Sequence, residues 1–440
     1  MRAGLIGGLA LRLAVVMGVA TAAASVAAVG GVAWRRWAVR GGVALAALSS
    51  VALAALVWAL ATGDFRLVYV ADVTTRATPW HFRVAALWGG MAGSLLFWAW
   101  MCSLYAVAAP RAVGGRRPDL APGAVAVLAG LAGAFLAVTA SLADPFRSLA
   151  IPAIDGGGLN PILERPAMLY HPPLLYGGLV GTAVPAAMAV AGLVSGRLDR
   201  AWLALVRRWA GVAWLLLAVG MLAGAHWAYA ELGWGGYWAW DPVENAALVP
   251  WLVLTALLHA AVVAERRGHG QRRVAGLAVV GLAAAVVGAT LARSGVTVSV
   301  HAFAEARAVG AALLAVVVAV VAGGGVLLGR TRPPRQVRRH RSPVWPPSRA
   351  GALAGSTAVA LALAGVVAWG SVFPLLARLW GEGQFVVGGR FFALFTAPLA
   401  LAVAVGLGVG PRLRWSASAP PDLARWVAPA GSGALAGVVL

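Results

Sequence analysis

The chain has 440 residues, of which 61% are hydrophobic and 11% are charged. This composition excludes a water-soluble globular protein and predicts an integral membrane protein, because apolar runs of about 20 residues, the length of a membrane-crossing helix, recur along it. The formal net charge of +21 does not indicate nucleic-acid binding, since the basic residues, all of them arginine, lie in short clusters between the apolar runs.

The apolar runs predict an all-α polytopic membrane protein with about eleven transmembrane helices and an incomplete twelfth. The first run is long for a signal peptide and only Arg2 precedes it, so we expect it to remain as a helix. We treat residues 1–440 as a single membrane domain. The runs lie near residues 5–33, 42–61, 85–109, 121–143, 172–195, 209–230, 246–264, 274–292, 308–328, 350–377 and 392–410, with the incomplete one at 426–440.

The loops between these runs alternate in arginine content, and this alternation predicts the orientation. One set of loops carries 24 arginines, whereas the other set carries nine. By the positive-inside rule the arginine-rich set is cytoplasmic. The N-terminus is then outside, as are the segments 144–171, 234–245 and 293–307, in which polar and aromatic residues gather.

Residues 234–251 hold four tryptophans, a tyrosine and two carboxylates in an otherwise apolar sequence. Flat amphipathic rings so close together suit another flat, partly polar molecule. The segment also starts a helix, because Asp241 can act as N-cap, Pro242 fits the first helical position and Glu244 follows three residues after the cap. An interfacial belt is the plainer explanation, but a belt scatters its rings at both interfaces. We therefore predict a rigid aromatic shelf above a helix N-terminus.

Three of the seven histidines are candidate ligands. The topology places His171 and His301 at outer helix ends beside the tryptophans, where two imidazoles can ligate a haem iron from both faces. Hydrogen bonding to loop carbonyls is the alternative. His259 lies roughly 25 Å along the helix that starts at Pro242. It is thus within the membrane, as a haem ligand or as a buried structural histidine. The others, His81, His226, His269 and His340, have no predicted ligand role.

The tryptophan segment resembles the WWD motif of the CcmF/NrfE-type cytochrome c haem lyases, relatives of the CcsA haem-handling proteins. Tyr237 stands where the motif often has a tryptophan. Further matches at residues 159–164, 171–176, 293–296, 299–304 and 387–392 extend the resemblance over about residues 40–415 and favour the CcmF type. The resemblance implies a CcsA/CcmF-like core at about 85–310 and a CcmF-type extension at about 311–440. We expect that extension to be incomplete, because the family's other membrane histidine lies well beyond Arg414.

By this resemblance, His171 and His301 are axial ligands of the haem b to be attached. His259 would ligate a second, membrane-embedded b-type haem that keeps the first one reduced. The outer arginines Arg147, Arg165, Arg293 and Arg307 are candidates for pairing with haem propionates. The loop expected to hold the haem comprises Trp234, Gly235, Gly236, Tyr237, Trp238, Trp240 and Asp241.

The family's reaction adds the two thiols of an apocytochrome c Cys-X-X-Cys-His segment across the haem vinyl groups. The resemblance therefore implies an enzyme, a carbon–sulfur bond-forming haem lyase in the cytoplasmic membrane of a bacterium, with its site facing outside. It also implies as partners apocytochrome c, a haem chaperone and a thiol-handling subunit that presents the apocytochrome. We expect catalysis mainly by positioning, with Asp241 and Glu244 as capping groups rather than acid/base groups. The alternative is a membrane exporter of haem or another amphipathic ligand.

Overall fold

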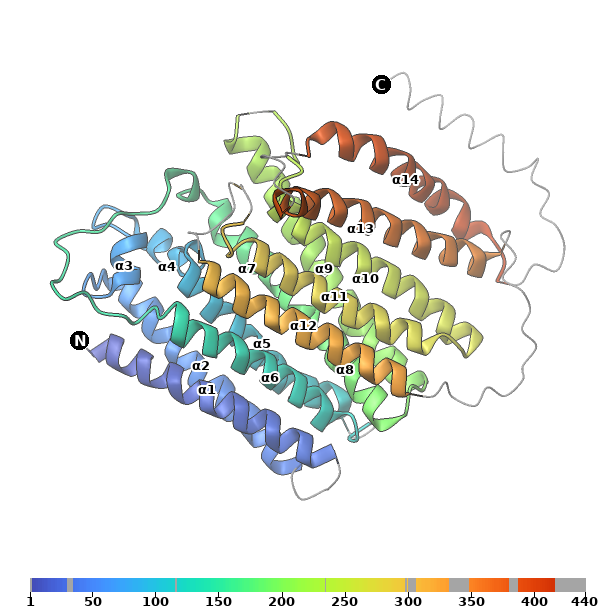
Figure 1. Ribbon diagram of the computed structural model, residues 1–440, viewed down its shortest axis with the longest axis horizontal. Coiled ribbons are helices and arrows are strands. Elements are labelled where there is room, and N and C mark those ends of the chain that lie inside the picture. Colours follow the sequence, from blue (N-terminus) through green and yellow to red (C-terminus); the bar gives the residue numbers. More distant parts are fainter. Residues whose placement is uncertain are drawn as a thin grey trace.

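The computed structural model of the protein is almost wholly helical (Figure 1). It describes residues 2–29, 35–114, 117–233, 235–296, 299, 306–331, 348–379 and 387–415. The α-helices are α1 (Arg2–Val29), α2 (Arg35–Thr62), α3 (Val68–Val73), α4 (Trp80–Gly89), α5 (Met91–Val113), α6 (Ala121–Leu142), α7 (Ala167–Gly181), α8 (Ala183–Ser195), α9 (Arg200–Glu231), α10 (Pro242–Arg267), α11 (Gln271–Leu291), α12 (Arg307–Arg330), α13 (Arg349–Leu379) and α14 (Gly389–Val409). Two short 3₁₀ helices span Pro161–Leu163 and Gly410–Arg412.

Eleven helical stretches among the described residues are long and apolar enough to cross a membrane, which agrees with the predicted number. One of these stretches, Ala167–Ser195, consists of α7 and α8 together. Within the described ranges there is no strand, although an isolated antiparallel bridge joins Leu67 and Ser148. The predicted fold class is confirmed, whereas the run at 426–440 lies outside the described residues.

Several helix boundaries differ from the apolar runs, and two of the differences involve α4 and α7. The run at 85–109 is divided between α4 and α5 at Gly90, whose backbone is extended. The Tyr69 hydroxyl lies 2.8 Å from the Ala86 carbonyl oxygen and 3.1 Å from that of Leu87, so it satisfies acceptors at the end of α4. At the second boundary, α7 begins at Ala167 rather than near residue 172, which places His171 inside the helix. An apolar run ends at a polar side chain, whereas the backbone hydrogen bonds of the helix continue past it.

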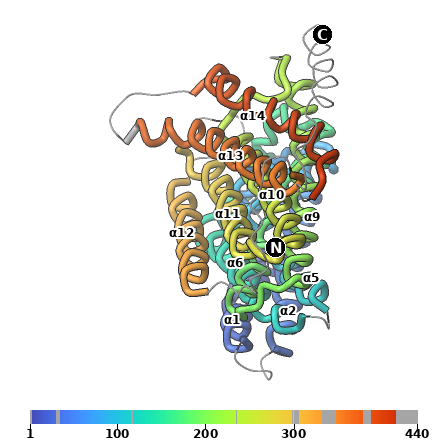
Figure 2. The backbone as a smooth tube through the Cα atoms, turned by 90° about the vertical axis from the view of Figure 1, so that its right-hand side faces the viewer, coloured from blue at the N-terminus to red at the C-terminus, as the bar shows by residue number. Residues whose placement is uncertain are grey.

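Figure 1 shows the long helices running side by side, with α1 and α2 at one edge and α13 and α14 at the opposite edge. Figure 2, turned by 90°, shows the same separation. Between these edges α7 packs on α9, and α10 contacts α9, α11 and α13. The tryptophan segment joins α9 to α10, so it lies at the end of the bundle where α10 begins.

The outer surface of the bundle is apolar. Large side chains on α1, α9, α12 and α14 are exposed, among them Leu5, Leu222, Val318 and Leu401. In water such a surface would be unfavourable, whereas it is the surface expected of helices that face lipid.

The end of the bundle away from the tryptophan segment carries ion pairs between the arginine-rich connections. Arg117 is buried and lies 2.9 Å from Asp119 and 2.5 Å from Asp199, so it joins the connection before α6 to the one before α9. Its hydrogen bond holds the pKa of Asp119 below the usual range. Arg207 and Glu265 pair in the same way across α9 and α10, at 2.9 Å.

Candidate functional site

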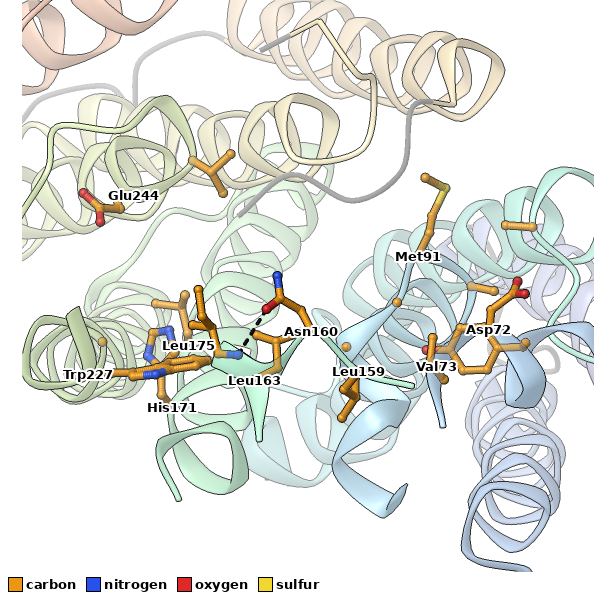
Figure 3. A pocket seen from close by; sticks show the side chains of 18 of the residues that line it. Asp72, Val73, Met91, Leu159, Asn160, Leu163, His171, Leu175, Trp227 and Glu244 are labelled. Atoms are coloured by element: carbon orange, nitrogen blue, oxygen red, sulfur yellow. Dashed lines mark hydrogen bonds between the residues drawn. The ribbon is translucent and has the colours of Figure 1, made fainter. Parts of the chain in front are cut away.

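A cavity of about 880 Å³ lies at the end of the bundle where the tryptophan segment is found. Its walls come from α3, α5, α7, α9 and α10 and from the segments 141–147 and 158–163. Figure 3 shows His171 and Trp227 together at one side, Asp72 and Val73 at the other, and Asn160 between them. A cavity of this size is in the range of sites that bind a small molecule or cofactor.

His171 has a fixed tautomer. Its Nδ1 lies 2.8 Å from the carbonyl oxygen of Gly220 in α9. A carbonyl oxygen only accepts hydrogen bonds, so Nδ1 carries the proton and Nε2 carries the lone pair of the neutral ring. Histidines that bind metals typically donate their second ring nitrogen to a carbonyl or carboxylate in this way. The imidazole also contacts the indole of Trp227, with ring centroids 5.7 Å apart and planes at 73°.

Two glycines of α9 allow His171 and the backbone of α7 to lie close to α9. A Cβ atom on Gly224 would lie 2.5 Å from Cε1 of His171 and 3.0 Å from its Nδ1. A Cβ atom on Gly220 would lie 2.8 Å from the backbone of Leu175 in α7. Any larger side chain at these positions would have to rotate the imidazole or push the two helices apart.

Aromatic side chains form the wall beside His171. Trp227, Tyr237 and Trp238 all line the cavity. Tyr237 stacks on Tyr229, with ring centroids 4.6 Å apart and planes at 9°. Within the described part of the chain, the buried indole nitrogen of Trp227 has no hydrogen-bond partner. The wall therefore offers flat apolar faces to the cavity.

The carboxylates of Asp241 and Glu244 accept hydrogen bonds at the start of α10. Asp241 Oδ1 accepts from the N–H of Val243 at 2.8 Å, and Oδ2 accepts from the hydroxyl of Ser299 at 2.6 Å. Pro242 occupies the first helical position. Glu244 also lines the cavity, and its Oε2 accepts from the N–H of Ala239 at 2.9 Å. Both side chains thus stabilise the turn into the helix.

Trp240 does not line the cavity, so the tryptophans do not form one continuous shelf. Its backbone has φ +59°, in the left-handed region that residues other than glycine rarely adopt. Its ring stacks on Phe392 of α14, with centroids 4.6 Å apart and planes at 2°. The rings of Trp238 and Trp240 are nearly perpendicular, at 79°. Gly235 and Gly236 precede these rings in the loop and do not line the cavity either.

Only one of the four candidate arginines, Arg147, lines the cavity. Arg165 pairs with Glu231 at 2.9 Å, and Arg307 is exposed at the start of α12. Arg293 is only 2% exposed, and its Nη2 donates to the hydroxyl of Ser94 at 2.9 Å and to that of Tyr176 at 3.2 Å. Arg293 therefore joins α5, α7 and the end of α11 in the interior. Trp234 and His301 lie outside the described residues.

His259 lies beside a second cavity, of about 300 Å³, between α10, α13 and α14. Trp251 and Thr255 of α10 line it as well. Within the described residues, the buried Nδ1 of His259 has no hydrogen-bond partner. A buried polar atom without a partner is unfavourable, so His259 is not a histidine whose ring is fully satisfied by the described helices around it.

Sequence reasoning missed three contributors to the larger cavity. Trp227 and Gly224 belong to an apolar helix and carry no motif of their own. Asn160 was part of a motif, but nothing in its spacing placed it beside His171. The signal that brings these residues together is the packing of α7 on α9, which no single segment reveals.

Comparisons with known proteins find related sequences and a related structure. The family described as Cytochrome C assembly protein matches residues 88–297. CcmF of Escherichia coli (strain K12) is 39% identical over 368 residues, which are 83% of this chain and 56% of that protein. The ccl1 protein of Rhodobacter capsulatus is 36% identical over 401 residues, 90% of this chain and 61% of that protein. A probable NrfE of Escherichia coli (strain K12) is 35% identical over 359 residues, 82% of this chain and 64% of that protein.

The chain thus spans between 56% and 64% of the length of these relatives. A solved structure described as "Cytochrome c Heme Lyase CcmF" is similar to the whole chain, with a TM-score of 0.81 and 31% sequence identity. The similarity covers 100% of this chain and 67% of that one. Sequence, helix number and tertiary arrangement lead to one conclusion: the chain belongs to the CcmF family of cytochrome c-type biogenesis proteins.

Proposed function

We propose that this chain is the haem-handling part of a cytochrome c haem lyase in the cytoplasmic membrane of a bacterium, with its site on the outer face. The geometry of the His171 side chain is the main support for this proposal. Its Nδ1–H is directed to the Gly220 carbonyl at 2.8 Å, so Nε2 has the lone pair needed to ligate iron, and the residue lines the cavity of about 880 Å³. The names of the relatives and the arginine-poor loops around the cavity support the same function and orientation.

The residues around the cavity fit haem b as a substrate. A porphyrin is flat and largely apolar, and Trp227 and Trp238 present aromatic surfaces beside His171. Its propionates are anionic, and Arg147 provides a cation in the lining. His301 is the second axial ligand by resemblance to the family. Tyr237 and Asp241 support this site from the loop.

The reaction is the addition of the two cysteine thiols of an apocytochrome Cys-X-X-Cys-His segment to the two vinyl groups. Each addition forms one carbon–sulfur bond and transfers the thiol proton to the other vinyl carbon, so no oxidant or reductant is consumed. The chain contributes by holding the porphyrin in one orientation beside the thiols, which makes the encounter effectively intramolecular. Asp241 and Glu244 keep the loop in place rather than transfer protons.

We assign a second, resident b-type haem to the smaller cavity. His259 would hold it through an imidazole nitrogen, and Trp251 would pack against it. When bound there, such a group would supply electrons to keep the substrate iron ferrous. The partners of the complex are then apocytochrome c, a haem chaperone that delivers haem and a thiol-handling subunit that presents reduced cysteines.

The test uses the purified protein, haem and a reduced Cys-X-X-Cys-His peptide. We expect a low-spin Soret band on adding haem, and then peptide-bound haem that resists acid–acetone extraction. His171→Ala should abolish both, whereas His81→Ala, at the same end but outside the cavity lining, should retain both. Haem bound reversibly and released across a vesicle membrane, with no thioether product under reducing conditions, would favour the exporter instead.

A further inference from the structure

Asn245 is a fully buried amide in the first turn of α10, and it makes three hydrogen bonds. Its Oδ1 accepts from the indole Nε1–H of Trp238 at 3.3 Å. Its Nδ2 donates to the carbonyl oxygen of Trp240 at 3.1 Å and to the hydroxyl of Ser371 in α13 at 3.0 Å. One side chain thus contacts the cavity wall, the strained loop residue and a helix 126 positions away in the sequence.

The orientation of this amide is determined by its partners. An indole N–H can only donate, and a backbone carbonyl can only accept. The Ser371 hydroxyl gives its own proton to the Val367 carbonyl at 2.7 Å, so it too accepts from Asn245. A carboxylate in place of the amide would face the Trp240 carbonyl, which can only accept, and would compete with the Val367 carbonyl for the Ser371 proton.

The same part of the loop is held from α14. Phe392 is 1% exposed and stacks on Trp240, and it packs so closely on α13 that a Cβ atom on Gly370 would lie 2.6 Å from its ring. Both Ser371 and Phe392 lie beyond residues 88–297, the part matched by the assembly-protein family. The α13–α14 pair therefore contacts the loop through residues that do not line the cavity.

We infer that Asn245 is a positioning residue, which directs Trp238 into the cavity and holds Trp240 in its left-handed conformation against α13 and α14. The left-handed backbone at Trp240 is unfavourable by itself and persists only where its surroundings fix it. The hydrogen bond from Asn245 to the Trp240 carbonyl and the stacking of Trp240 on Phe392 provide this restraint. Through them the C-terminal helices determine the shape of the aromatic wall. The role in haem binding rests on the proposed function, whereas the role in ordering the loop does not.

The experiment uses a nitroxide spin label on Ala239→Cys in the full chain without haem. Ala239 is exposed in the loop, and the one native cysteine, Cys102, is fully buried, so only the new thiol reacts. The variants Asn245→Ala, Asn245→Asp and Ser371→Ala are compared in this background. Ser49→Ala is the matched control, because it removes a buried hydrogen bond of 2.8 Å, to Ser103, elsewhere in the bundle.

We expect the label to be immobilised in the parent and in Ser49→Ala. Loss of one hydrogen bond in Ser371→Ala should shift the equilibrium toward the mobile state about fivefold, and Asn245→Ala should shift it further. Asn245→Asp should also mobilise the loop, although its volume is unchanged. A Soret titration of the unlabelled variants should show haem affinity falling in the same order, with Ser49→Ala unaffected.

An immobile label in Asn245→Asp and Ser371→Ala would overturn the inference, whatever happens to Asn245→Ala. So would a mobile loop combined with parental haem affinity, because the residue would then not position the wall. If the parent itself binds no haem in this cavity, the proposed function fails. The spin-label comparison still decides whether Asn245 orders the loop.

Discussion

Replacing Gly224 by alanine tests whether the packing of α9 on His171 sets the orientation of the ligand. The new Cβ atom would lie 2.5 Å from Cε1 of the imidazole, whereas non-bonded carbon atoms prefer about 3.5–4.0 Å. The ring must therefore move by about 1 Å or more. Such a shift would break the 2.8 Å hydrogen bond from Nδ1 to the Gly220 carbonyl and turn Nε2 away from its position.

The expected magnitude follows from the role of that hydrogen bond. Removing the partner that orients a metal-binding histidine typically lowers metal affinity by roughly 10–100-fold, so haem affinity should fall by about this factor. The helix itself should not weaken, because alanine is favoured over glycine in a helix interior by roughly 0.5–1 kcal/mol. The loss should therefore appear in binding and not in thermal stability.

The assay is a Soret titration of the purified variant, together with a thermal unfolding curve. Gly211→Ala is the matched control, since it makes the same substitution in the same helix where a Cβ atom would meet nothing within 4 Å. Equal haem affinity for Gly224→Ala and Gly211→Ala would refute the reasoning, because His171 would then not depend on its packing against α9.

Three further predictions concern the surroundings of the site. Asp241→Ala should lower the free energy of unfolding by about 1 kcal/mol through loss of the helix cap, while Asp241→Asn keeps a capping oxygen; equal melting temperatures would contradict this. Arg293→Met should destabilise the protein by about 1–3 kcal/mol in chemical denaturation, because Ser94 and Tyr176 lose their buried donor, yet leave the Soret maximum unshifted. Backbone N–H groups hold the pKa of Asp155 below its usual range. Its contribution to the stability of the folded loop is therefore present above the unfolded-state pKa, and it is lost as the pH falls through the folded-state pKa. Proteolysis of residues 150–158 should accordingly rise below about pH 4, and Asp155→Asn should flatten that rise.

The membrane-spanning helices could be predicted because hydropathy is a property of each segment alone. The start of α10 was readable for the same reason, since Asp241, Pro242 and Glu244 act on their own helix. The break between α4 and α5 was not readable. The Tyr69 hydroxyl satisfies acceptors at this break, and it approaches the end of α4 from a short helix that hydropathy does not detect.

The candidate site was only partly predictable, because its residues meet through packing between helices. The motif residues His171 and Trp238 do line one cavity. Trp240 belongs to the same motif but turns away, since Phe392 stacks on it from α14. The contributions of Gly220 and Gly224 appear only when α7 lies against α9. The motif therefore identified the loop from the sequence. The orientation of each ring depends on its packing against the other helices.

The central claim is that the cavity beside His171 holds the porphyrin through this residue. The most direct measurement is an electron cryo-microscopy map of the full chain after loading with haem. We predict planar density between Trp227 and Trp238, with the iron at coordination distance from Nε2 of His171 and with Nδ1 still bonded to the Gly220 carbonyl. Density for haem only beside His259, or a porphyrin in the larger cavity with its iron out of reach of His171, would contradict the account.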